Sequence, residues 1–187
     1  MKKLIPLAAI LLAALIAVVV WQVTSSSSGP SAQPAATASA PAALPVATNP
    51  IHNPSTNAGL SITDAIAENN VDPQTKAPVA DRLQFTIHNS SQQSLSSLQV
   101  YYTMKDKSTG KTESYFQQLT GVTLAPQTSQ TVYFDNGTGP GHYPENKYSL
   151  YRSSTNEVDF SIEASASGLA PATATAVKSP GTGEKLD

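Results

Sequence analysis

The side chains best suited to catalysis in this chain are its three histidines, His52, His88 and His142, and the chain has no cysteine. A histidine acts as a general base when a carboxylate orients its ring, and it activates a serine that lies within hydrogen-bond reach. None of the three stands at a catalytic spacing from such a partner, and no GxSxG, HExxH or Gly-rich phosphate loop is present. We therefore predict that the protein is not an enzyme; the enzymatic alternative would require the fold to bring His88 or His142 to an acid.

The stretch 135–146, DNGTGPGHYPEN, combines oxygen donors with glycines. Asp135, Asn136 and Glu145 supply oxygens, and the glycines allow the backbone to fold back so that carbonyl groups can join them. Calcium prefers flexible coordination by oxygen alone, so these three residues are candidate calcium ligands. The alternative is ordinary turn chemistry, because Gly, Asn and Asp dominate loops and the DxDxDG spacing is missing.

Aromatic residues provide a second candidate site. Tyr101, Tyr115 and Tyr133 occupy positions that we expect to face outward on strands, and His142 with Tyr143 stands at the tip of the glycine-rich loop. Aromatic rings with one face exposed to solvent are suited to stacking against sugar rings, so these five residues are candidate ligand-binding residues. The alternative is cross-strand pairing that shields the sheet.

The charge of the chain excludes some partners. Charged residues make up 13% of the sequence and the net charge is −2. Lys2 and Lys3 are the only charges before residue 59, so the remainder carries nine of the 11 basic residues against all 13 acidic ones. An acidic domain has no electrostatic attraction for phosphate backbones, so nucleic acid is not an expected partner. The absence of cysteine excludes disulfides and thiolate metal sites, so packing alone must hold the fold.

The N-terminus predicts a location. Lys2 and Lys3 precede an apolar run from Leu4 to Trp21, 18 residues that are just long enough to span a bilayer. Basic residues before such a run place the N-terminus in the cytoplasm and the following chain outside it. We therefore expect residues 1–23 to form a signal-anchor helix, which makes this a single-pass protein of the cell membrane. The alternative is a cleaved signal peptide and a secreted protein.

Three further regions follow the predicted anchor. Residues 24–58 are rich in Ser, Ala, Pro and Thr, which bury too little apolar surface to offset ordering entropy, and we expect a disordered stalk. Residues 59–170 hold the apolar alternation of a folded domain. Residues 171–187 are expected to form a C-terminal tail with at most one short strand.

The folded domain is organised around LQFTIHNSSQQSLSSLQVYYTM, from Leu83 to Met104. Leu83, Phe85 and Ile87 alternate with polar residues, a polar loop follows, and a second alternating run begins at Leu98. This pattern predicts two antiparallel strands. Further strands are expected over 60–68, 112–119, 131–134, 148–151 and 158–162; for 60–68 the alternative is a helix, because Ile62 and Ile66 are also helix-spaced. Short strands at regular spacing indicate an all-β, antiparallel β-sandwich.

The sequence from Leu83 onward resembles the immunoglobulin-like sandwich domains of bacterial envelopes. The shared features are a strand that ends at Asn89-Ser90, a polar loop containing leucine, and the turn Leu124–Ser129, in which Gln127 replaces a glycine. The strand Val100–Thr103 is also similar to a strand of family 3 carbohydrate-binding modules. The resemblance covers about 50 residues and implies an immunoglobulin-like sandwich.

Together these features predict a non-catalytic, membrane-tethered binding module outside the cytoplasm. The first functional hypothesis is a protein-interaction or structural module of the cell envelope, whose edge strands pair with an envelope protein. The alternative is a carbohydrate-binding or adhesion head that uses the exposed tyrosines, secreted if the signal is cleaved.

Overall fold

Alternating apolar residues build the central strands of two sheets, as the sequence predicted. The computed structural model describes residues 43–68, 83–135 and 137–180. In β2 (Leu83–Asn89) every second residue is buried, beginning with Leu83, and β3 (Gln99–Asp106) repeats the pattern from Val100. Side chains alternate between the two faces of a strand, so one face of each sheet is apolar and packs on the other sheet.

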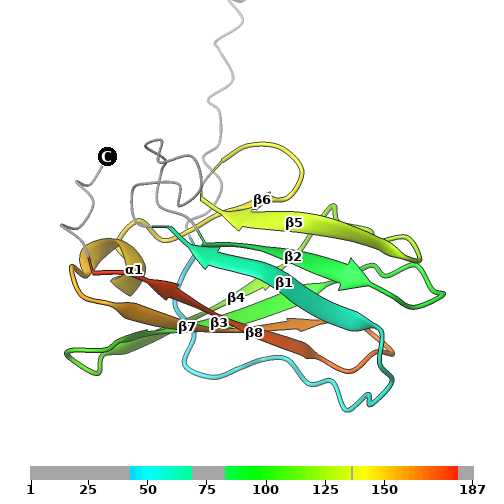
Figure 1. Cartoon of the computed structure of the whole chain (residues 1–187), viewed down its shortest axis with the longest axis horizontal. Helices are drawn as coiled ribbons and strands as arrows, with labels where there is room; N and C mark the ends of the chain where they lie inside the picture. Colours follow the sequence, from blue (N-terminus) through cyan, green and yellow to red (C-terminus); the bar gives the residue numbers. More distant parts are fainter. Residues whose placement is uncertain (1–42, 69–82, 136, 181–187) are drawn as a thin grey trace, which may run out of the picture. The chain divides into compact units, whose positions relative to one another are not determined.

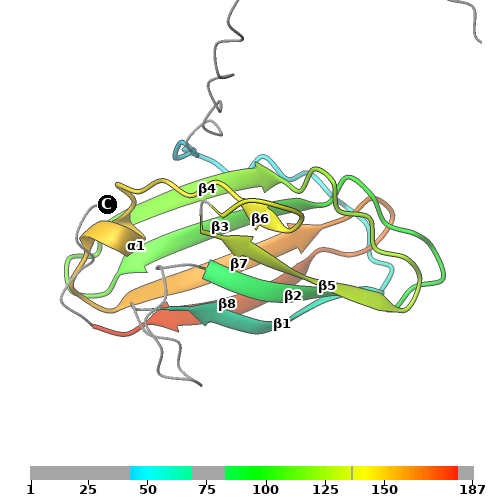
Figure 2. The same ribbon diagram turned by 90° about the horizontal axis from the view of Figure 1, so that it is seen from above.

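The eight described strands form two layers (Figures 1 and 2). One sheet has the order β1-β2-β5-β6 and the other has the order β4-β3-β7-β8, and all pairs are antiparallel except β5 with β6. The remaining strands are β1 (Leu60–Ala67), β4 (Thr112–Gln118), β5 (Thr128–Phe134), β6 (His142–Tyr143), β7 (Val158–Ser165) and β8 (Ala172–Lys178). The fold is therefore an all-β sandwich, and the strand predicted over 60–68 is confirmed as β1.

Aromatic rings fill the centre between the two layers. The ring of Phe134 lies 5.8 Å from that of Phe85 in its own sheet and 5.2 Å from that of Tyr102 in the other sheet. Both phenylalanines are fully buried. Aromatic pairs at such separations add to the stabilisation that burial alone provides, so this cluster holds the two sheets together.

Two predicted elements differ from the structure. The strand expected over 148–151 is the helical turn α1 (Leu150–Ser153), because the hydroxyl of Ser149 accepts a hydrogen bond from the Arg152 amide and caps it. The tail expected over 171–187 contains the seven-residue strand β8, whose alanines face inward and whose threonines face outward. At its end the buried Lys178 donates from Nζ to the carbonyl oxygen of Ser154 (2.5 Å).

The predicted stalk over 24–58 also differs from the structure, because its last part belongs to the sandwich. Residues 43–58, called the strap below, contain no strand but run across the outer face of the β4-β3-β7-β8 sheet, drawn in cyan beneath that sheet in Figure 1. The amide of Val46 donates to the carbonyl oxygen of Ser114 on β4, and Ile51 is buried. The rest of the stalk and the expected anchor helix over 1–23 lie outside the described residues. Within the described part, no helix has the length and apolarity needed to cross a membrane.

Candidate functional site

The outer face of the β4-β3-β7-β8 sheet carries aligned polar and aromatic side chains. Strand register places Tyr101 of β3 between Phe116 of β4 and Glu163 of β7, and Glu163 next to Thr173 of β8. A parallel row of hydroxyl groups runs beside it through Ser114, Thr103, Ser161 and Thr175. Neighbouring strands lie about 4.8 Å apart, so these side chains form a closely spaced array.

Part of this face is hollowed into a groove of about 500 Å³. We call it the outer groove, and it is lined by Tyr101, Thr103, Ser161, Ile162, Glu163, Thr173, Ala174 and Thr175. Tyr101 is the only aromatic residue of this lining and Glu163 the only charged one. The groove therefore offers one flat apolar ring surrounded by hydroxyl groups and one carboxylate.

The strap fixes the carboxylate of the outer groove. The side-chain amide of Asn49 donates to Oε2 of Glu163 at 2.8 Å, across 114 residues of sequence. Further along the strap, the amide of Asn53 donates to the hydroxyl of Ser165 (2.8 Å) and to the carbonyl oxygens of Ala166 and Leu169. These bonds hold the strap on the sheet, and one acceptor oxygen of Glu163 has a defined position.

The predicted aromatic residues do not gather in one place. Tyr101 faces outward in the outer groove, as expected, but Tyr133 lies on the other sheet, in β5. Tyr115 and Tyr143 are only 2% and 4% exposed, so the expectation that they offer a solvent-facing surface is wrong. Tyr115 pairs with Tyr102 in the β3–β4 register, and its ring stacks on that of Tyr102 at 5.5 Å in the core.

His142 does meet an acid in the folded chain. Its Nδ1 lies 2.9 Å from Oδ1 of Asp135, and its ring stacks on that of Tyr133 with centroids 4.9 Å apart. The same carboxylate oxygen accepts a hydrogen bond from the amide of Gly137. This arrangement can orient an imidazole, but among the described residues the hydrogen bonds of the His142 ring go to Asp135 alone. The pair therefore provides the orienting half of a catalytic triad without a described nucleophile.

The candidate calcium ligands have separate partners. Asp135 binds His142, whereas Glu145 forms an ion pair with Arg152, whose Nε lies 2.9 Å from Oε2 in a buried site. Asn136 lies outside the described residues. Within the described ranges, no group of three or more His, Asp or Glu side chains is placed to hold a metal ion.

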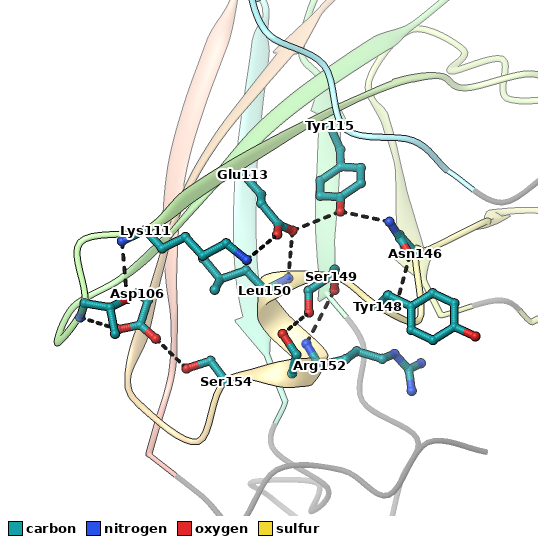
Figure 3. A network of polar contacts seen from close by, with 12 residues as sticks. Asp106, Lys111, Glu113, Tyr115, Asn146, Tyr148, Ser149, Leu150, Arg152 and Ser154 are labelled. Atoms are coloured by element: carbon teal, nitrogen blue, oxygen red, sulfur yellow. Dashed lines mark hydrogen bonds and ion pairs between the residues drawn. The ribbon is translucent and has the colours of Figure 1, made fainter.

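A polar network beside α1 contains residues that the sequence patterns did not single out (Figure 3). Oε2 of Glu113 accepts hydrogen bonds from the hydroxyl of Tyr115 (3.1 Å) and from the amide of Leu150 (2.8 Å). The amide of Asn146 in turn donates to the Tyr115 hydroxyl. Burial, and secondly the nearby carboxylate of Glu113, raise the pKa of Tyr115. The side chains of Glu113 and Tyr115 on β4 thus bond to Asn146 and to the backbone of Leu150, and this network anchors α1 to β4.

Asp106 ties the hairpin after β3 to the segment after α1. Its carboxylate accepts from the hydroxyl of Ser154 (2.6 Å), the amide nitrogen of Asn156 and the backbone amides of Ser108 and Thr109. These bonds, with the Ser154 hydroxyl first, lower the pKa of Asp106 well below its usual value. Hydrogen bonds to a carboxylate favour its ionised form, so the folded state prefers ionised Asp106.

This preference predicts the acid sensitivity of the protein. Because the pKa of Asp106 is lower in the folded state, its stabilisation is present above about pH 4, the unfolded pKa, and is lost as the pH falls. We expect Asp106→Asn to lower the melting temperature at pH 7 and to make its decline below pH 5 shallower. Thermal melts between pH 7 and pH 2.5 measure this, with Asp159→Asn controlling for the lost charge. Parallel profiles for wild type and Asp106→Asn would contradict the assignment.

Comparison with protein-family models and with curated proteins finds no match. Among solved structures, the sporulation control protein Spo0M of Bacillus subtilis aligns with a TM-score of 0.34 and 11% identity, over 65% of this chain and 49% of that one. The Pseudomonas fluorescens alkylpurine DNA glycosylase AlkC, bound to DNA with an abasic site analog, aligns with a TM-score of 0.30 and 17% identity, over 66% of this chain and 30% of that one. The chain thus spans about half or less of either protein's length, and similarities this low carry no functional argument.

Proposed function

We propose that this protein is a non-catalytic carbohydrate-binding module of the cell envelope, which residues 1–23 anchor in the membrane with the sandwich outside the cytoplasm. The observation that carries the proposal is the outer groove, where Tyr101 lies beside Glu163 and a row of hydroxyl groups. A sugar ring has an apolar face of C–H groups and a rim of hydroxyls. The tyrosine ring suits the first, and the carboxylate and hydroxyl side chains suit the second.

We further propose that the fold is immunoglobulin-like, in line with the resemblance noted above. The order β1-β2-β5 corresponds to strands A, B and E of that fold, and β3-β7-β8 corresponds to strands C, F and G. With this assignment the outer groove lies on the C-F-G sheet. The proposed ligand would thus be bound by a regular sheet, whose side chains are held more precisely than those of loops.

The surface favours this function over the protein-interaction hypothesis. Stable protein interfaces need about 1,000 Å² or more with an apolar, aromatic-rich core. The large hydrophobic side chains exposed in the described residues are Leu44, Tyr148 and Val177, which belong to the strap, the segment before α1 and the end of β8. Such scattered residues do not make the contiguous patch that marks a protein-binding surface.

Replacing Tyr101 tests the proposal directly. The full-length chain, in a detergent without a sugar headgroup, is incubated with cellulose, chitin, xylan and β-1,3-glucan, and bound protein is measured. We expect retention on at least one polysaccharide, and Tyr101→Ala should weaken it about fivefold or more, because stacking accounts for ~1 kcal/mol beyond area burial.

Tyr133→Ala is the matched control, because Tyr133 is a half-buried tyrosine on the outer face of the opposite sheet. It should leave retention unchanged. Retention on none of the polysaccharides would refute the proposed function. Equal losses in both variants would refute the outer groove as its site.

A further inference from the structure

A second hollow lies where the strap meets the end of the same sheet. It has a volume of about 380 Å³, and we call it the strap pocket. The strap contributes His52, Asn53, Pro54 and Ser55, and the sheet and its loops contribute Ser97, Gln99 and residues 165–168. It therefore exists only because residues 43–58 lie on the sheet.

The strap pocket continues the outer groove along the same two strands. Gln99 lines the strap pocket and Tyr101 lines the groove, two residues apart on β3, and Ser165 and Glu163 stand in the same relation on β7. Residues two apart on a strand face the same way and lie about 6.6 Å from each other. The two hollows therefore adjoin each other on the sheet, and a sugar chain of several units can extend from one into the other.

The strap pocket is polar, and apart from His52 its lining contains no ionisable side chain. Hydroxyl and amide groups supply donors and acceptors, and Pro54 adds a small apolar ring. This chemistry does not compensate a phosphate, a carboxylate or an ammonium group on a ligand. In the adjoining groove the one charge is the Glu163 carboxylate, which repels anions.

Ser97 provides an independent observation at this pocket. Its φ angle is +56°, in the left-handed region that non-glycine residues adopt at a cost of about 1–2 kcal/mol. Glycine would remove this cost, yet the chain has serine here, with its side chain exposed at the pocket wall. Residues held in such conformations cluster at ligand sites.

We propose that the strap pocket is a second subsite of the outer groove, and that the ligand is a neutral oligosaccharide long enough to occupy both hollows. This inference rests on the proposed function and specifies its ligand, which is an uncharged chain of several sugar units that occupies both hollows. A single sugar fills only the outer groove.

Chain-length dependence tests this. The full-length protein is titrated calorimetrically, in the same detergent, with β-1,4-linked glucose oligomers and β-1,4-linked N-acetylglucosamine oligomers of one to six units. We expect the affinity for one series to rise at least tenfold between the disaccharide and the hexasaccharide. Ser167 is exposed at the strap pocket, so the larger side chain of Ser167→Trp should fill this pocket. The variant should bind the disaccharide like the wild type, and it should bind the hexasaccharide no more tightly than the disaccharide.

The control is Ser129→Trp, which places the same side chain at an exposed position of β5 on the opposite sheet and should bind both oligomers like the wild type. A hexasaccharide that binds no tighter than the disaccharide, or no tighter in wild type than in Ser167→Trp, would overturn the second subsite while leaving the proposed function intact. Absence of binding to every oligomer and to the four polysaccharides would overturn both.

Discussion

An Asn89→Asp protein is expected to lose about 3 kcal/mol of its free energy of unfolding. Asn89 ends β2 and is 1% exposed. Its amide nitrogen donates to the carbonyl oxygens of Gln93 (2.7 Å), Leu124 (3.1 Å) and Ala125 (3.0 Å). Aspartate would place a carboxylate oxygen against three carbonyl oxygens, so it would lose these bonds and bury an uncompensated charge.

Urea denaturation followed by circular dichroism measures this change. Asn57→Asp is the matched control, because Asn57 is exposed and donates one hydrogen bond, to the carbonyl oxygen of Gly168. It should cost well under 1 kcal/mol, as surface changes usually do. A similar cost for the two variants would mean that the Asn89 amide does not hold the β2–β3 loop.

The buried amide also decides how Asn89-Ser90-Ser91 behaves. The triplet has the N-x-S pattern of an N-glycosylation acceptor. A glycan would have to be attached to the nitrogen that donates these three hydrogen bonds. The folded protein therefore cannot be modified there, and the asparagine serves the fold.

Phe134→Ala is expected to cost about 3–5 kcal/mol, the usual range for removing a fully buried aromatic ring. The ring of Phe134 contacts Phe85 and Tyr143 within its own sheet and Tyr102 in the facing sheet. Because these neighbours belong to both layers, the cavity cannot close without moving one sheet against the other. The cost should therefore lie in the upper part of that range.

Phe134→Leu is the comparison that isolates the cavity, since leucine keeps most of the volume and should cost under about 2 kcal/mol. Denaturant midpoints and slopes for the two variants give the difference. If Phe134→Ala were no more destabilising than Phe134→Leu, the aromatic cluster would not be the contact that holds the layers together.

The sequence predicted those strands in which strong β formers alternate with polar residues. The strands β2 and β3 have Leu, Phe, Ile, Val and Tyr on the buried face, and their limits follow from that pattern. In β8 the buried face consists of three alanines, which have low β propensity, and Lys178, so the apolar alternation of this strand is weak in the sequence. The apolar residues over 148–151 also fit a strand, but the hydroxyl of Ser149 caps a helical turn there and stabilises it.

The candidate site was predictable only in part, for two physical reasons. In β4 the adjacent Tyr115 and Phe116 are both aromatic, so sequence does not show which one faces the core, and a shift of one residue reverses the answer. The strap is held by asparagine side chains that reach distant parts of the chain, as Asn49 reaches Glu163. Contacts of this kind leave no periodic signal, and a segment without apolar periodicity resembles a linker.

Strands at the edges of sheets expose backbone groups that can pair with other chains and start aggregation. In the described sheets, the edge strands are β1, β4, β6 and β8, of which β1 and β4 carry visible protection. The register of β1 with β2 shifts between Thr63 and Ile66, and this bulge makes β1 less suitable for pairing with a strand of another chain. On β4 the backbone carbonyl oxygen of Ser114 already accepts a hydrogen bond from the backbone amide of Val46 in the strap. A chain cut after the strap would leave the carbonyl oxygen of Ser114 unpaired at this edge, so the strap covers part of the β4 edge against pairing with a neighbouring chain.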